Sequence, residues 1–570
     1  MHIIEKLYKP ILIVIIVLSL ALRLYNTTWD HAFYLHPDEL HIYSTVTQLH
    51  FPKTISEFFS PESGLNPHFF AYGSLPLYIL FFLSQIISGI SFGNLYMIGR
   101  PLSALFDIGT LILLFHLTKT LLKSKRWALV AAFLYACAVF PIQYAHFYNV
   151  DTQLTFWLFA TLILCTHALV KNKKEFLYAA TATAGLAFST KFSAVLILPL
   201  LAVVFFILLN DVHRNSQFTN VKKFAHFSVF FATLAFTFIG VTFITQPYAY
   251  LDHTNYMTDI FRQLRMGSDA HTFVYTYQYL DTLPYIYPLQ QIFTWGLGPI
   301  TTLFGFLGIL TLTVGVIKNI KKFTKENLLW LPYLLFFWLF FQLVGTSAVK
   351  FMRYYLPLYP LLILGAVYVY RSCAEALKKV NVPLMHINIL LVIVILPSVL
   401  WGCAFMSIYT KPHTWIQASS WIHNTIEEGS ILLTEYWDYS LPLSNSQRYV
   451  IRQFDFYQTD TVLKIEGLVS QLEQTDYIVL ASNRLYKSIP KLPNTYPATI
   501  RYYDLLFSGE LGFEKIAEFH SYPRLFGIEI NDQSADESFT VYDHPKVEVF
   551  KRTNFDTEHT KQVLIEAFDY

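Results

Sequence analysis

The sequence is poor in charge and in cysteine. Only 14% of its 570 residues are Asp, Glu, Lys or Arg, whereas soluble proteins average about 25%. This deficit, together with a hydrophobic content of 54%, excludes an ordinary soluble protein and predicts a polytopic membrane protein. The 4 cysteines lie in or beside apolar segments, so neither a disulfide framework nor a cysteine metal cluster is indicated. The net charge of +2 gives no sign of a nucleic-acid partner.

Apolar segments fill the first part of the chain. A membrane-spanning helix needs about 20 mostly apolar residues, and candidate segments lie at about 9–25, 74–92, 98–118, 127–147, 152–170, 176–190, 193–210, 224–246, 292–317, 327–347, 352–370 and 386–408. From residue 411 the pattern is mixed and polar, with strand-like runs at 477–481 and 546–550. We therefore expect a transmembrane domain over residues 1–410 and a small soluble α/β domain over residues 411–570.

The basic connections between these segments indicate the cytoplasmic side of the membrane. They lie at 119–126, 171–174, 214–223, 318–325 and 371–379. Alternation from residue 126 onward places Asp151, the long loop 247–291 and the C-terminal domain outside the cytoplasm. This favours a multi-pass protein of the cell membrane with a cytoplasmic N-terminus, a retained first helix and an extracytoplasmic C-terminal domain.

One parity problem affects this topology. Segments 74–92 and 98–118 both precede the first basic cluster, and two full crossings there would reverse every later loop. Segment 74–92 is weakened by glycine, serine and proline, so we expect that it does not cross fully, which leaves about eleven crossings. Alternatively, the two segments form one crossing with a broken end, or the first helix is reversed, which would leave Asp38 inside.

Three carboxylates mark the predicted outer face. Asp38 and Glu39 follow the first apolar segment, and Asp151 opens a later one. Charge at the end of a spanning helix is costly unless it faces water, a partner or a substrate. A carboxylate there can accept a proton from an incoming hydroxyl or amine, or hold a divalent cation such as Mg²⁺ or Mn²⁺. The structural alternative is that Asp38 and Asp151 each cap a helix.

A zinc site near Asp38 is a weaker alternative. His36 and His41 flank Asp38, but histidines five residues apart do not share one helical face, and no third strong ligand is near in the sequence. We therefore predict no metal-ligating residues.

Basic residues at the outer face are candidates for binding an anion. Positive charge on an outer loop runs against the orientation rule, and a phosphate ligand would explain it. The alternative is that each side chain reaches toward lipid headgroups. Arg262 and Arg265 are three residues apart and would share a helix face. The strongest candidates lie on two outer turns, Arg353 beside Tyr354 first and Lys191 second.

Several stretches resemble motifs of the GT-C glycosyltransferases. The most similar branch contains the protein O-mannosyltransferases, the aminoarabinose transferase of lipid A and bacterial family 39 relatives. The stretches are His-Pro-Asp-Glu at 36–39, a proline-containing stretch at 72–78, Arg-x-x-Ser-Ala-Leu from Arg100, the second acidic motif at 147–152, a late helix start at 353–360 and a tail at 535–545. The resemblance spans nearly the whole chain. One departure counts against lipid A as substrate, because Ser74-Leu75-Pro76 lacks the Lys-Pro-Pro of those enzymes.

The resemblance implies an inverting transfer at the outer face. The donor would be a polyprenyl-phosphate sugar within the membrane lipids, and the acceptor a glycan, lipid or protein. Asp38 would be the base, Asp151 would orient the acceptor or assist Asp38, and Glu39 would help to position Asp38. Stabilising charge that develops in the transition state often contributes most to catalysis, and the departing phosphate would meet Arg353 and Lys191. The other predicted substrate contacts are Tyr354, Arg262, Arg265 and Arg100.

Two other classes of protein stay open. A transporter or flippase would show ionisable residues in mid-membrane and paired halves. Here Asp107 is the one convincing mid-segment acid, and no internal repeat is visible. A non-catalytic membrane protein would use residues 411–570 to bind a glycan or a protein.

Overall fold

The computed structural model describes residues 2–87, 91–214, 219–319, 325–438, 441–443 and 446–569. The chain forms two compact units. The first contains residues 1–27, 37–264 and 284–403, and the second contains residues 28–36, 265–283 and 404–570. The second unit therefore includes two stretches from the first half of the chain in addition to its C-terminal part.

The first unit is built of helices. Its helices that bear on the spans and on the candidate site are α1 (His2–Leu24), α2 (Pro37–Gln48), α3 (Ile55–Phe58), α4 (Leu75–Ile86), α5 (Tyr96–Leu122), α6 (Lys125–Ala136), α7 (Val139–Ala145), α8 (Val150–Lys171), α9 (Lys174–Thr190), α10 (Leu198–Arg214), α11 (Asn220–Thr245), α12 (Tyr248–Leu251), α15 (Pro299–Asn319), α16 (Lys325–Thr346), α17 (Tyr359–Lys379) and α18 (Leu384–Met406). Helix α13 (His253–Ser268) begins in this unit, and two 3-10 helices, η2 (Phe192–Ile197) and η6 (Met352–Leu358), precede α10 and α17.

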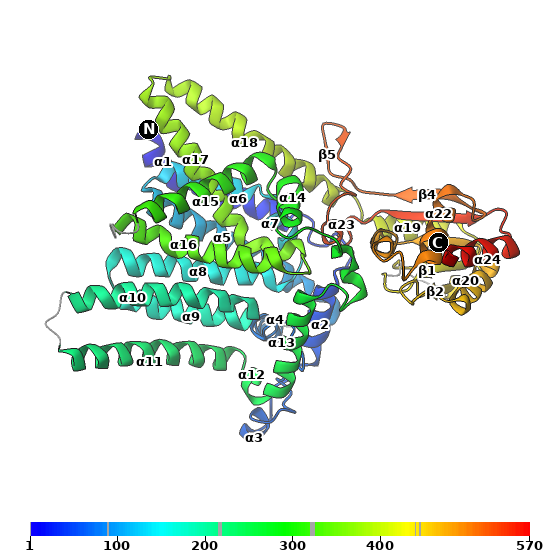
Figure 1. The fold of residues 1–570 in the computed structure, drawn as a ribbon, viewed down its shortest axis with the longest axis horizontal. Helices are drawn as coiled ribbons and strands as arrows, with labels where there is room; N and C mark the ends of the chain where they lie inside the picture. Colours follow the sequence, from blue (N-terminus) through cyan, green and yellow to red (C-terminus); the bar gives the residue numbers. More distant parts are fainter. Residues whose placement is uncertain are drawn as a thin grey trace. The chain divides into compact units, whose positions relative to one another are not determined.

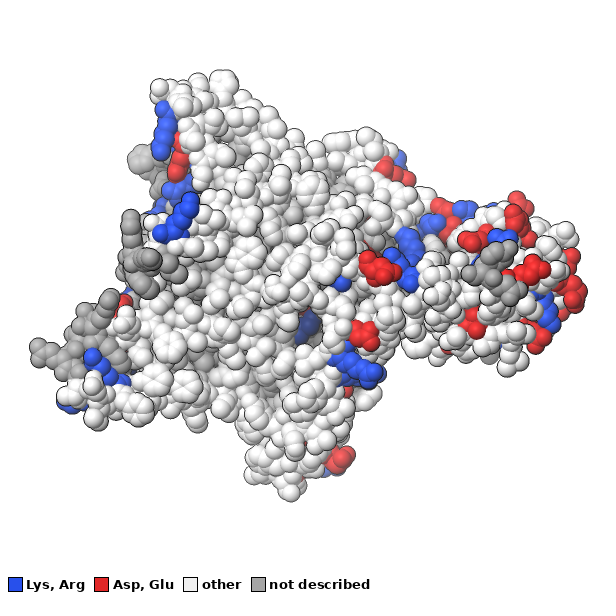
Figure 2. Space-filling view, in the orientation of Figure 1, with Lys and Arg blue, Asp and Glu red and all other residues white. Residues whose placement is uncertain are grey.

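Within the described residues, 9 helices are long and apolar enough to span a membrane, or 10 if the bent pair α6 and α7 is one span. Figure 1 shows α8, α9, α10 and α11 lying side by side, and Figure 2 shows a broad uncharged surface over the spanning helices. Helix α4 has only 12 residues, about 18 Å, which is too short for a hydrocarbon core of about 30 Å. The predicted crossing at 176–190 corresponds to α9, which has 17 residues. The total of about eleven crossings therefore stays a prediction.

Glycines bring α15 and α17 into close contact. A Cβ atom added to Gly308 would lie only 2.0 Å from the carbonyl oxygen of Gly365. Small residues of this kind let the backbones of membrane helices approach closely. Because α17 follows η6 directly, this contact also fixes the segment that carries Arg353 and Tyr354.

The second unit contains a five-stranded sheet in the order β2-β1-β3-β7-β4. Strands β1 (Ile431–Glu435), β2 (Val450–Phe454) and β3 (Tyr477–Leu480) are parallel, whereas β7 (Val547–Arg552) runs antiparallel to β3 and to β4 (Phe513–Phe519). Its helices include α19 (Thr414–Thr425), α20 (Val462–Gln474), α22 (Pro497–Ser508) and α24 (Thr557–Glu566). The predicted class, a helical polytopic membrane protein with a small α/β domain, is confirmed.

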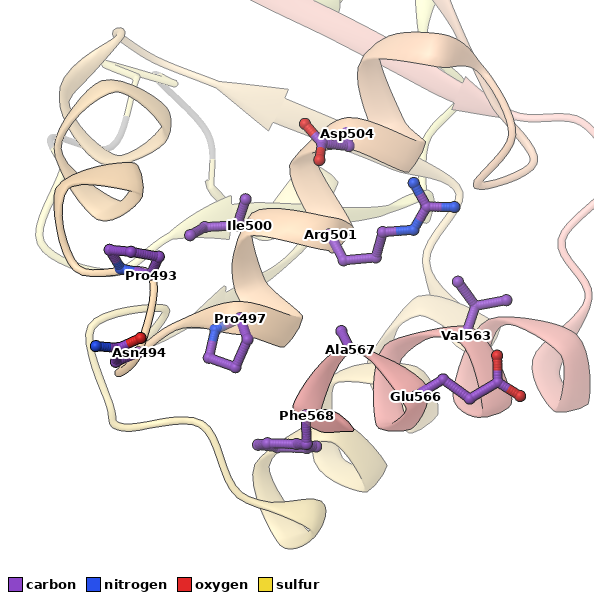
Figure 3. Close-up of a pocket in the computed structure, with 10 residues that line it drawn as sticks. All are labelled: Pro493, Asn494, Pro497, Ile500, Arg501, Asp504, Val563, Glu566, Ala567 and Phe568. Atoms are coloured by element: carbon purple, nitrogen blue, oxygen red, sulfur yellow. The ribbon is translucent and has the colours of Figure 1, made fainter. Parts of the chain in front are cut away.

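Two polar features lie within the second unit. The buried imidazole of His544 contacts Asp543 and, at 2.8 Å, Asp532, while the hydroxyl of Tyr409 donates to Asp543 at 2.7 Å. A cleft of about 790 Å³ lies between α22 and the α24 segment, and its lining includes Arg501, Asp504 and Phe568 (Figure 3). None of the residues predicted to act on the substrate lines this cleft.

Candidate active site

Asp38 lies in the first turn of α2, where the helix dipole favours a negative charge. Its carboxylate forms an ion pair with the guanidinium of Arg353, which lies in η6, far from Asp38 along the chain. The two side chains are 19% and 12% exposed, so the pair is only partly sealed from solvent. The ion pair therefore brings together the acidic stretch at 36–39 and the late stretch at 353–360, both of which the sequence analysis identifies.

Asp151 lies in the first turn of α8 but does not cap it. The side chain of Asn149 caps α8 by accepting from the Asp151 backbone N–H at 2.9 Å. The Asp151 carboxylate instead accepts from Nζ of Lys191 at 2.7 Å, and Lys191 stands between α9 and η2. The side chains of Asp151 and Lys191 are 4% and 16% exposed. The structural alternative, in which Asp151 is the helix cap, is therefore wrong.

Tyr354 joins the two ion pairs. Nζ of Lys191 lies 4.8 Å from the centroid of its ring, and the guanidinium carbon of Arg353 lies 5.9 Å from the same centroid. A cation at this distance from an aromatic ring is attracted to it. One contact network thus contains five of the predicted site residues, namely Asp38, Asp151, Lys191, Arg353 and Tyr354.

Glu39 is fully buried and holds a different partner. Arg100 donates from Nε and Nη2 to its two carboxylate oxygens at 2.9 and 2.6 Å, and neither side chain is exposed. The hydroxyl of Tyr43 and the backbone N–H of Tyr148 also donate to Glu39, at 2.8 and 3.0 Å. Arg100 further donates to the carbonyl of Thr27 at 2.6 Å, so its guanidinium is engaged within the protein.

The Glu39 contacts connect the two acidic motifs. Tyr148 precedes Asn149 and Asp151, so its backbone bond to Glu39 holds the start of α8 against the start of α2. The positioning role that the resemblance implies for Glu39 stays a prediction. Arg100 was predicted to bind substrate, but its observed contacts favour a role in holding Glu39.

Two glycines allow backbone segments to close around these acids. A Cβ atom on Gly99 would lie 2.5 Å from the hydroxyl of Tyr43 and 2.9 Å from the ring of Tyr148. The backbone N–H of Gly73 donates to the carbonyl of Thr190 at 3.0 Å, directly before Lys191. A Cβ atom on Gly73 would lie 2.0 Å from the carbonyl oxygen of Ser189, so a side chain there would displace the turn that carries Lys191.

A second buried ion pair, between Arg23 and Asp107, was missed in part. Their side chains are 0% and 1% exposed. The hydroxyl of Tyr135 donates to Asp107 at 2.6 Å, and Arg23 also donates to the carbonyl of Ala136 at 2.9 Å. A lone acid in an apolar segment predicts a basic partner, and that signal identified Asp107 but not Arg23.

The other residues that the sequence analysis considers, Arg262, Arg265 and His41, lie outside this contact network. Arg262 and Arg265 are both exposed on α13. The ring of His41 packs 4.2 Å from that of Phe69, and burial lowers the pKa of His41.

The acids do not fit a divalent cation held between them. Asp38 and Asp151 are each neutralised by a basic side chain, and a shared cation would have to displace both. Among the described residues, no group of three His, Cys, Asp or Glu side chains is arranged to hold a metal ion.

Comparisons with known proteins agree with this picture. Residues 76–240 match the family model of the dolichyl-phosphate-mannose-protein mannosyltransferases, a stretch that contains Asp151 and Lys191. A search of curated proteins finds no match.

Two solved structures are similar in fold. The apo oligosaccharyltransferase of Archaeoglobus fulgidus has 14% identity and a TM-score of 0.52, over 92% of this chain and 75% of that one. ArnT from Cupriavidus metallidurans, solved with undecaprenyl phosphate, has 12% identity and a TM-score of 0.43, over 96% of this chain and 97% of that one. At such an identity the likeness to the oligosaccharyltransferase shows the fold alone. The family match over residues 76–240 and the similar fold both support the resemblance seen in the motifs.

Proposed function

We propose that the protein transfers a sugar from a polyprenyl-phosphate donor to an acceptor at the outer face of the membrane, with inversion at the anomeric carbon. The acceptor is a glycan, a lipid or a protein that presents a hydroxyl or an amine. The observation that carries this proposal is the network of two acids and two bases around Tyr354. It offers proton acceptors and anion ligands side by side, as transfer from a phosphate-linked sugar requires.

Asp38 is the proposed base. The acceptor oxygen or nitrogen attacks the anomeric carbon, its proton passes to Asp38, and the bond from that carbon to the phosphate oxygen breaks. The lipid phosphate leaves with the electron pair. Of the three acids, Asp38 has the most exposed side chain, 19% against 4% for Asp151 and 0% for Glu39, so an acceptor reaches it most readily.

Arg353 and Lys191 are the proposed ligands of the donor phosphate. Without donor, each forms an ion pair with one of the acids. A carboxylate held by a guanidinium is a weak base, because the pairing stabilises its charged form. An incoming phosphate competes for Arg353 and thereby increases the basicity of Asp38. In this scheme proton transfer is coupled to donor binding, because Asp38 stays a weak base until the donor phosphate binds.

A transporter is less well supported. Asp107, the mid-segment acid that could indicate a transporter, pairs with Arg23, and both side chains are closed to solvent. A buried, paired charge is what a structural contact between α1 and α5 requires, whereas an ion path needs groups that solvent or substrate can reach.

The proposed orientation places the N-terminus in the cytoplasm and both the acid network and residues 411–570 outside. Single cysteines at Glu62 and Glu473, which are exposed, should then react with an impermeant thiol reagent added outside intact cells, and one at Lys123 should not. The exposed native residues Cys373 and Cys403 must first be replaced by serine. Equal labelling of positions 123 and 473 would contradict the orientation.

The decisive experiment is an assay of purified protein with a panel of polyprenyl-phosphate sugars. Release of lipid phosphate is measured with and without candidate glycan, lipid and peptide acceptors. We expect acceptor-dependent release with one donor class and an inverted linkage in the product. Binding of a glycan without release from any donor would favour the non-catalytic alternative.

A further inference from the structure

Helices α12 and α13 begin immediately after a membrane span. Helix α11 ends at Thr245, and α12 begins at Tyr248, only a few residues later. Figure 1 shows α13 running across the ends of α8 to α11 rather than along them. A helix that starts at the end of a span and runs across it lies near the plane of the membrane surface.

One side of the exposed surface of α13 is apolar. Met257, Phe261 and Leu264 are 41%, 61% and 51% exposed. Their spacing of four and then three residues places them on one side of the helix. Ile260 and Met266 are buried. At 100° per residue Met266 lies opposite the stripe and Ile260 lies about 60° from Met257, so the stripe borders the face of α13 that packs on protein.

Positive charge lies beside this apolar stripe. At 100° per residue, Arg265 lies about 40° around the helix from Phe261 and Arg262 lies about 100° from it, both on the same side of the stripe. Both arginines are exposed. The carboxylate of Asp259, which also lies on α13, accepts a hydrogen bond from the backbone N–H of Phe70 at 2.8 Å. The outer side of α13 therefore combines an apolar stripe with cationic side chains.

The neighbouring loop continues the apolar surface. Ile55 and Phe59, in and just after α3, are 81% and 53% exposed. This loop is tied to α12, because the hydroxyl of Tyr248 donates to the carbonyl of Phe58 at 3.0 Å. A further bond joins Asn66 to Asp252 at 2.9 Å. Helices α3, α12 and α13 thus form one platform.

We propose that this platform lies on the membrane leaflet at the Asp38 side, with the stripe Met257, Phe261 and Leu264 in the acyl boundary and with Arg262 and Arg265 on phospholipid phosphates. The occupant is the lipid surface because the stripe is continuous along the chain with the lipid-facing span α11, and because the flanking charges complement anionic headgroups. Amphipathic helices with an apolar face and a cationic edge bind membranes in this way. The proposal concerns Arg262 and Arg265 as ligands of bulk lipid and is independent of the reaction proposed above.

A depth measurement tests the placement. A nitroxide is attached at Phe261→Cys or, as a matched control one helical shoulder away, at Thr258→Cys, both in a protein with Cys373 and Cys403 replaced. Thr258 is exposed on the same helix and bonds only to the carbonyl of Thr254. In vesicles of phosphatidylcholine and phosphatidylglycerol, the label at 261 should collide mainly with oxygen and that at 258 mainly with a water-soluble nickel chelate.

Every other outcome overturns the proposal. Access of the chelate to position 261 equal to that at 258 would mean that the face lies in water, and access of neither quencher would mean that protein covers it. A second arm tests the arginines. Adding phosphatidylglycerol to phosphatidylcholine should lower chelate access at 261 at least about twofold, and the change R262Q/R265Q should abolish this dependence on lipid charge. Because no sugar transfer is measured, failure here leaves the proposed reaction untouched.

Discussion

Asp38 and Glu39 are neighbours in the chain and yet have opposite surroundings. The Asp38 carboxylate is partly exposed and pairs with Arg353 at the surface of the network. The Glu39 carboxylate is fully buried, receives both arms of Arg100 and two further hydrogen bonds, and is closed to solvent. One step along a helix turns a side chain by about 100°, which is enough to separate a group that can react from a group that holds the fold.

The same contrast applies to the other ion pairs. Asp151 and Lys191 resemble Asp38 and Arg353, since at least one partner of each pair reaches solvent. Arg23 and Asp107 resemble Glu39 and Arg100, since both partners are buried. We infer that the open pairs serve the reaction and that the closed pairs fix the helices, and substitutions that remove one charge from each kind of pair separate these roles.

The largest expected effect is that of Asp38→Asn. Asparagine keeps the size of the side chain and removes the base, and a general base contributes about 10²–10⁴-fold to rate. Turnover of purified protein with its donor should fall by that factor, while expression and thermal stability in detergent stay near wild type. Asp504→Asn, an exposed acid of the second unit, is the matched control. Transfer at the wild-type rate in Asp38→Asn would remove Asp38 as the base.

Glu39→Gln should act on folding. The change leaves the buried guanidinium of Arg100 without its counter-charge, and breaking a buried pair typically costs about 3–5 kcal/mol. Thermal unfolding should show the loss directly. Replacing both partners, as Glu39→Leu with Arg100→Met, should recover much of it, because an apolar pair avoids the desolvation of both charges. A stable Glu39→Gln protein that has lost turnover would instead make Glu39 part of the chemistry.

The contrast between Asp38 and Glu39 shows which parts of the site the sequence predicts. The sequence predicted Asp38, Asp151, Lys191 and Arg353 because charged residues at the ends of apolar segments are costly unless they meet water, a partner or a substrate. Pattern alone could not say which base meets which acid, since that depends on the rotation of each helix. Glu39 was therefore grouped with Asp38, Arg100 was assigned to substrate, and Arg23 was not seen as the partner of Asp107. The strands at 477–481 and 546–550 were predictable from local pattern, whereas the assignment of 28–36 and 265–283 to the second unit depends on tertiary contacts.

Arg353→Ala should weaken donor use more than Arg371→Ala. Hydrogen bonds to charged groups contribute about 1.5–3 kcal/mol, so kcat/KM for the donor should fall roughly 10- to 150-fold. Arg371 is the control because it pairs with Glu375 at 2.7 Å on α17, in the basic set that orients the chain. Arg353→Lys should recover only part of the loss, since an ammonium cannot reproduce the guanidinium fork. Similar losses for the two alanine variants would argue against a phosphate role.

The buried cluster of His544, Asp543 and Asp532 should make the stability of the second unit depend on pH. Burial alone would lower the pKa of His544, but Asp543 and Asp532 outweigh it and raise that pKa to about 10. A raised pKa means that the stabilisation is complete below the unfolded value of about 6.5 and is lost as pH rises toward 10. Between pH 7 and 8 the free energy of unfolding should fall by about 1 kcal/mol.

Hydrogen exchange at the β3 and β7 amides of the full chain measures this loss. His544→Gln should be less stable at pH 7 and should show a flatter dependence on pH than the wild type. The exposed His559→Gln variant should behave like the wild type. An unchanged slope in His544→Gln would mean that another group titrates.

The smallest expected effect is at Tyr354, where the two open pairs meet. Its ring lies 4.8 Å from Nζ of Lys191 and 5.9 Å from the guanidinium carbon of Arg353. A cation–π contact at a partly exposed site contributes about 0.5–1 kcal/mol, so Tyr354→Ala should lower kcat/KM about two- to fivefold. Tyr354→Phe keeps the ring and should stay within about twofold of wild type, because the contact is with the ring face and not with the hydroxyl. If Tyr354→Phe were as impaired as Tyr354→Ala, the hydroxyl would be the active part of this residue, and Tyr354 would contact substrate rather than align the two cations.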